Sequence, residues 1–212
     1  MAIKENREYR NLGAFGIETR ADGETPAPAF IVTGYASTFD PYFMGEYEGV
    51  QTFEKIDRSA FDDTDKTDVV FLRDHTGTVL ARTKNGLIEL NTDEHGLHTW
   101  TDLSKTFAAR QMYEDIAAGN YTQMSFSFIA DRNADEYEWS DDGKRLTRII
   151  HRIEKLYDVS AVAFPANPGT DIGVSFRALF DGEIEQRTAE RLEAERMREI
   201  IRLKIKLAKA KR

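Results

Sequence analysis

Three segments that lie far apart in the sequence carry a histidine, a serine and an aspartate. A serine hydroxyl becomes a good nucleophile when an imidazole takes its proton, and the imidazole works best when a carboxylate orients it. His75, Ser125 and Asp158 could form such a site if folding brings them together. The segments read LRDH at 72–75, QMSFSF at 123–128 and LYDVSAVAFPANP at 156–168.

Predicted strands would position the histidine and the serine. The apolar run at 69–72 is typical of a buried strand, and His75 follows it closely. Residues 124–129 predict another strand. Because side chains alternate along a strand, Ser125 and Ser127 would face the same way, and either hydroxyl could meet the histidine.

The remaining pattern is one of short strands with a few helices. A longer helix would begin after Ser104 or Thr106 and end at Gly119, and a short one is predicted at 57–61. Residues 40–49 read as a loop. We expect a mainly β fold with α (α+β), an antiparallel β-barrel. Further strands are predicted at 30–39, 50–56, 86–90, 97–101, 136–139, 145–153 and 159–164, the last opened by Asp158.

Composition excludes several classes of protein. The chain has 212 residues, no cysteine and a net charge of −8, so a cysteine nucleophile and a thiolate metal site are excluded. Residues 183–212 carry a net charge of +4 and predict a charged helix, which leaves −12 on residues 1–182. An acidic body argues against nucleic-acid binding. No apolar run approaches the roughly 20 residues of a membrane span, so no membrane association is expected.

Taken together, the motifs resemble the prohead maturation proteases of tailed bacteriophages, serine proteases related in fold to the herpesvirus assemblins. The resemblance covers about residues 30–168. It rests on GYA at 34–36 followed by Phe39, on RSAF at 58–61, on the three segments above and above all on DVSAVAFPANP at 158–168. It implies an assemblin-type barrel with Ser125 as nucleophile, His75 as general base and Asp158 as the orienting acid, a position where the family often has glutamate. Ser127 stands where the family usually has glycine.

Alternatives remain open at several of these residues. Asp158 could instead pair with Arg152, and then Glu154 could be the third member. The assemblins use a second histidine in that role, so His151 is another option. His95 and His98 have an H-x-x-H spacing and could form a metal site with His75, although no further ligand follows at a characteristic interval.

The resemblance also implies a function and partners. We expect a serine endopeptidase that needs no cofactor and cleaves the scaffold, or the scaffolding region of the major capsid protein, and finally itself. It would act inside the assembling prohead in the host cytoplasm, and a homodimer is an open option. The rival hypothesis is a non-catalytic capsid-assembly module. The expected divisions are 1–29, a polar segment that could pack as an edge strand, 30–180, the protease domain, and 181–212, a charged helical tail that could be removable.

Overall fold

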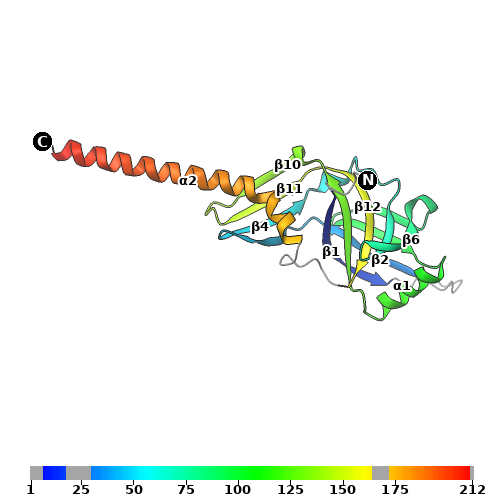
Figure 1. Cartoon of the computed structure of the whole chain (residues 1–212). Helices are drawn as coiled ribbons and strands as arrows, with labels where there is room; N and C mark the ends of the chain where they lie inside the picture. The colour runs from blue at the N-terminus through cyan, green and yellow to red at the C-terminus, as the bar shows by residue number, and fades with distance from the viewer. Residues whose placement is uncertain (1–6, 18–29, 164–171, 211–212) are drawn as a thin grey trace.

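The computed structural model describes residues 7–17, 30–163 and 172–210 and has two sheets (Figure 1). The predicted loop at 21–26 and the PANP motif at 165–168 lie outside the described residues. The larger sheet contains β1 (Glu8–Ile17), β2 (Ile31–Thr38), β5 (Val70–Arg73), β6 (Thr76–Arg82), β7 (Ile88–Thr92), β8 (Gly96–Asp102), β9 (Gln123–Ala130) and β12 (Ile153–Val162). The smaller sheet contains β3 (Tyr42–Tyr47), β4 (Val50–Ile56), β10 (Asp135–Trp139) and β11 (Arg145–Ile150).

The strand order tests the predicted barrel. The larger sheet has the order β6-β5-β12-β9-β1-β2-β8-β7, and the smaller one β10-β11-β4-β3. Most pairs are antiparallel, but β12 with β5 and β11 with β4 are parallel. Among the described strands no closed barrel is found, since β6 and β7 end the order without pairing to each other. The mainly β class with α is as predicted; the assemblin-type barrel is not confirmed.

Some local predictions need correction, and one strand was missed. Residues 40–49, expected as a loop, contain β3, which Gly45 and a register shift interrupt. Residues 76–82 form β6, a strand that the sequence analysis missed. The N-terminal segment is no edge strand either, because β1 lies inside the larger sheet between β9 and β2.

Two helices accompany the sheets. In α1 (Phe107–Ala117) the side chains of Ala109, Met112 and Ile116 are buried against the main core. Of the two predicted N-cap residues, Thr106 is the one that caps the helix, since its hydroxyl accepts a hydrogen bond from the Ala109 N–H at 3.1 Å. Short 3-10 helices occur at Arg58–Phe61, Thr83–Asn85 and Arg132–Ala134.

The second helix, α2 (Ile172–Ala210), is fixed to the body near its start and then extends away from it (Figure 1). Phe180 and Ile184 pack into the core of the smaller sheet beside Met44 and Leu146. Beyond this contact the helix is mostly exposed. None of the described helices is both long enough and apolar enough to cross a membrane.

A buried cluster of charged side chains joins the two sheets. Arg148 of β11 donates to Glu54 of β4 at 2.7 Å, to Glu8 of β1 at 2.8 Å and pairs with Asp135 at 2.6 Å. Arg10 of β1 also donates to Glu54, at 2.7 Å. Burial alone would raise the pKa of Glu54, but the charges of the two arginines outweigh it and lower the pKa to about 2. The first residues of β1 are therefore held from inside by ion pairs.

Candidate active site

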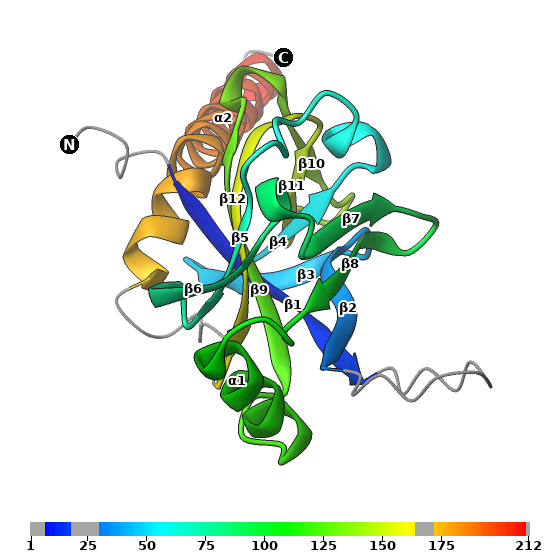
Figure 2. The same ribbon diagram turned by 90° about the vertical axis from the view of Figure 1, so that its right-hand side faces the viewer.

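Two neighbouring strands place four polar side chains on one face of the larger sheet. β9 and β12 lie side by side (Figure 2). In their antiparallel pairing, Ser125 lies opposite Ser160 and Ser127 lies opposite Asp158. Residues paired in this way point to the same side. The alternate residues of β9, such as Phe126, point into the core, where they anchor the strand.

The histidine comes from the two-residue turn between β5 and β6. Asp74 and His75 have φ values of 46° and 58°, as a type I′ hairpin turn requires of its central residues. Asp74 ties the turn to β12: its N–H donates to the carbonyl of Ala161 at 2.9 Å, and its carboxylate accepts from the N–H of Ala163 at 3.2 Å. The imidazole is thus presented to the strand that carries Asp158.

The structure brings the three predicted side chains together. His75 Nε2 lies 2.5 Å from Ser125 Oγ, and His75 Nδ1 lies 2.5 Å from Asp158 Oδ1. A carboxylate only accepts hydrogen bonds, so Nδ1 carries the proton and Nε2 can accept from the serine. Ser125 and Asp158 are fully buried, and 17% of the His75 side chain is exposed.

The Asp158 carboxylate accepts hydrogen bonds from other groups besides His75. Oδ1 also accepts from the hydroxyl of Ser160 at 2.6 Å, and Oδ2 accepts from Ser127 and from the Arg7 guanidinium. Burial alone would raise the pKa of Asp158. The hydrogen bond and charge of His75, with the two serine hydroxyls, outweigh burial and lower it, so the carboxylate is ionised near neutral pH. Ser127 therefore supports the carboxylate.

The other candidate residues lie elsewhere. Arg152 lies 4.0 Å from Asp131. The arginine that pairs with Asp158 is Arg7 instead. Glu154 is exposed on β12. His151 is 2.9 Å from Glu136 and 3.9 Å from Asp57.

The two histidines of the H-x-x-H spacing lie beside Tyr35. The ring centroids of His95 and His98 are 5.9 Å and 5.1 Å from that of Tyr35. Within the part of the chain that the structure describes, no group of three or more His, Cys, Asp or Glu side chains could hold a metal ion.

The sequence analysis missed the contribution of β1. Tyr9 packs edge-on against His75 with ring centroids 4.7 Å apart, and the carbonyl of Arg10 accepts a hydrogen bond from Ser125 Oγ at 2.9 Å. Arg7 contacts Asp158 and also donates to Ser127 at 2.6 Å. Nothing in the charged sequence REYR at 7–10 indicates this position, which follows only from the long-range pairing of β1 with β9.

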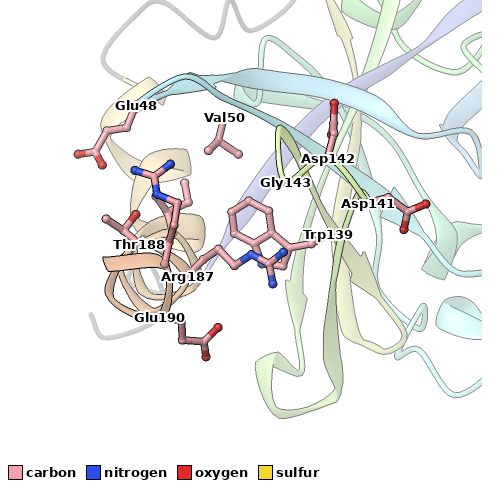
Figure 3. Close-up of a pocket in the computed structure, with 11 residues that line it drawn as sticks. Glu48, Val50, Trp139, Asp141, Asp142, Gly143, Arg187, Thr188 and Glu190 are labelled. Atoms are coloured by element: carbon pink, nitrogen blue, oxygen red, sulfur yellow. The ribbon is translucent and has the colours of Figure 1, made fainter. Parts of the chain in front are cut away.

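A cavity of about 470 Å³ lies between α2 and the hairpins of the smaller sheet (Figure 3). Arg187 of α2 lies over the ring of Trp139, 5.5 Å from its centroid, and Val50 and Asp142 also line the space. None of the three candidate side chains lines this cavity, so it is separate from the site around His75.

Comparison with known proteins agrees with this chemistry. The family described as caudovirus prohead serine protease matches residues 16–183, which include the site residues at 75, 125 and 158. Neither a curated protein nor a solved structure was found to match the chain. Because the match spans most of its length, the chain belongs to the caudovirus prohead serine protease family.

Proposed function

We propose that Ser125 is the nucleophile of this protease, with His75 as its general base and Asp158 as the group that orients the imidazole. The hydroxyl gives its proton to His75 Nε2 as Oγ attacks a peptide carbonyl carbon. The imidazolium then protonates the leaving amine, which leaves an acyl-enzyme. Water, deprotonated by the same imidazole, releases the acid product and regenerates the serine.

One observation carries this proposal: the ring of His75 bridges the hydroxyl and the carboxylate, at 2.5 Å on each side. The lowered pKa of Asp158 supports its role, because an ionised carboxylate stabilises the imidazolium that forms during proton transfer. The contacts of Asp74 with the β12 segment hold the turn that carries His75, and the pairing of β9 with β12 holds Ser125 and Asp158 on one face.

Family membership makes the chain a serine protease of phage capsid maturation, which acts on capsid proteins within the assembling capsid. Our proposal for its substrates is narrower: the scaffold or the scaffolding region of the major capsid protein, and the protease itself, in a prohead in the host cytoplasm. Residues 30–180 would form the protease domain together with β1, which lies inside its larger sheet, and residues 181–212 a tail. A homodimer fits the same proposal.

The test is co-expression with the capsid protein, followed by mass spectrometry of both proteins. Ser125→Ala should reduce cleavage by about 10⁶-fold, below detection, because nucleophile and base act as a unit. Ser140→Ala, in the exposed β10–β11 turn, is the matched control and should leave the products unchanged. Full cleavage by Ser125→Ala would disprove the assignment of the nucleophile.

A non-catalytic capsid-assembly module remains the rival reading of the same site. Labelling by a fluorophosphonate, which reacts with activated serines, separates the two. An adduct at Ser125 that is lost in His75→Ala supports the protease.

A further inference from the structure

The N-terminal part of β1 covers the candidate nucleophile. Along β9, Glu8 pairs with Phe128, Tyr9 with Ser127 and Arg10 with Phe126. Ser125 lies opposite Asn11, the residue that follows Arg10 in β1, and is 0% exposed. A substrate carbonyl must come within about 3 Å of the attacking oxygen, so the strand has to move before a peptide can react.

The same short segment contacts all three candidate groups. The Arg10 carbonyl meets the Ser125 hydroxyl, the Tyr9 ring packs on His75 and the Arg7 guanidinium pairs with Asp158. Arg7 also lies over the ring of Tyr157, its guanidinium carbon 4.4 Å from the ring centroid. Pairing within the sheet does not by itself require contacts with every member of the candidate site.

These contacts oppose catalysis. The single proton of a serine hydroxyl can go to one strong acceptor, and here the Arg10 carbonyl competes with His75 Nε2 for it. The Ser125 hydroxyl donates a hydrogen bond to the oxygen of the Arg10 carbonyl. Its own oxygen is therefore not placed to attack the carbon of that carbonyl. The Arg7 guanidinium also pairs with Asp158 and so offsets part of the negative charge that stabilises the imidazolium formed during proton transfer.

We propose that residues 7–10 are an intramolecular blocking segment, which occupies the position of the substrate chain on β9 and keeps the protease latent until it is displaced. The ligand that displaces it is an extended peptide segment, which adds to the edge of β9 in the manner of a sheet strand. This inference rests on the catalytic roles proposed above.

The pairing of β1 allows its first residues to leave while the rest stays. The pairing with β2 begins at Phe15, beyond a register shift between Asn11 and Gly13 in the pairing with β9. A bulge of this kind locally interrupts the ladder. The family match begins at residue 16, so the blocking segment lies outside the shared region.

The buried ion pairs are also compatible with displacement. Glu8 and Arg10 bond to each other and would leave together as a neutral pair. Arg148 would keep Glu54 at 2.7 Å and Asp135 at 2.6 Å. Glu54 and Asp135 would then share Arg148, so each charged group that stays would keep a partner of opposite charge. A buried charge with no partner is the most costly arrangement.

The test compares rates of fluorophosphonate labelling at Ser125. The double substitution Arg7→Ala, Tyr9→Ala removes the contacts to Asp158 and His75 and should raise the rate at least about tenfold, since reactivity scales with the open fraction. The control is Arg187→Ala, Tyr35→Ala, whose residues contact Trp139 and Asp93, and it should label at the native rate. Equal rates for the native chain and the Arg7, Tyr9 variant would overturn the blocking segment and leave the proposed nucleophile intact. No labelling of any of the three proteins would overturn both.

Hydrogen exchange on the native chain gives a second readout, which depends on no substitution. After prolonged labelling, the adduct should lose protection at the amides of residues 8–10, with β2 and β8 unchanged. Retained protection in the adduct would overturn the proposal, even if the variant reacts faster through its altered charge alone.

Discussion

The hydrogen bonds of Asp158 make a sharp prediction for Asp158→Asn. All four groups that contact the carboxylate donate to it: His75 and Ser160 at Oδ1, Ser127 and Arg7 at Oδ2. The substitution turns one oxygen into an NH₂ group. A guanidinium has no acceptor, so the NH₂ cannot face Arg7 and must face His75, where the Ser160 hydroxyl can rotate to accept.

The imidazole would then hold the wrong tautomer. Nδ1 would accept from the introduced amide and Nε2 would carry the proton, so that Ser125 would have no base. In the serine-protease template the equivalent change costs about 10⁴-fold in rate, which is about 5.5 kcal/mol at 1.36 kcal/mol per factor of ten. We expect a loss of this size in the cleavage of capsid protein, and ¹⁵N NMR of the His75 ring should show the proton on Nε2.

The matched control is Asp93→Asn, at an exposed aspartate that accepts from the Tyr35 hydroxyl, and it should keep native activity. Adding Arg7→Ala to Asp158→Asn should recover at least about tenfold, because the Ser127 hydroxyl can accept and the amide can then turn. A loss below tenfold in the single variant, or a proton that stays on Nδ1, would refute the reasoning.

Two further predictions concern stability. The pKa of Glu54 is lowered to about 2 from 4.5, so the folded state binds fewer protons than the unfolded state in this range. Stability should fall by about 3 kcal/mol as the pH drops through this window. In Glu54→Gln, urea unfolding should show a flatter pH dependence, and an unchanged slope would contradict this. A Cβ on Gly96 would lie 1.9 Å from the carbonyl oxygen of Ser37, so Gly96→Ala should cost about 3 kcal/mol in thermal unfolding. Gly182→Ala, which meets nothing within 4 Å, is its control and should stabilise α2 by up to about 1 kcal/mol; similar effects at both sites would count against the steric argument.

Local patterns predicted most strands, and the family resemblance pointed to the three candidate site residues; features that depend on long-range pairing could not be predicted. The strand before His75 and the shared face of Ser125 and Ser127 follow from apolar runs and alternation, which depend on neighbours in sequence. The predicted barrel depended on which strands pair, and the parallel contact of β12 with β5 joins residues more than 80 positions apart.

The position of β1 beside Ser125 could not be predicted from the sequence for the same reason, because it depends on long-range strand pairing. Residues 7–10 read as a polar segment because three of the four are charged. Their charges pair with Glu54, Arg148 and Asp158, and these partners are brought together only when both sheets form. β3 escaped prediction because Gly45 and its bulge break the alternation that marks a strand.

The pairing of β9 with β12 has a mechanical consequence. Ser125 and Asp158 lie two residue pairs apart on the same face of one hydrogen-bonded ladder, so motion of the sheet moves them together. His75 rides on a separate turn, coupled to that ladder through the two bonds of Asp74. Any movement of this turn therefore changes both distances to the ring at once.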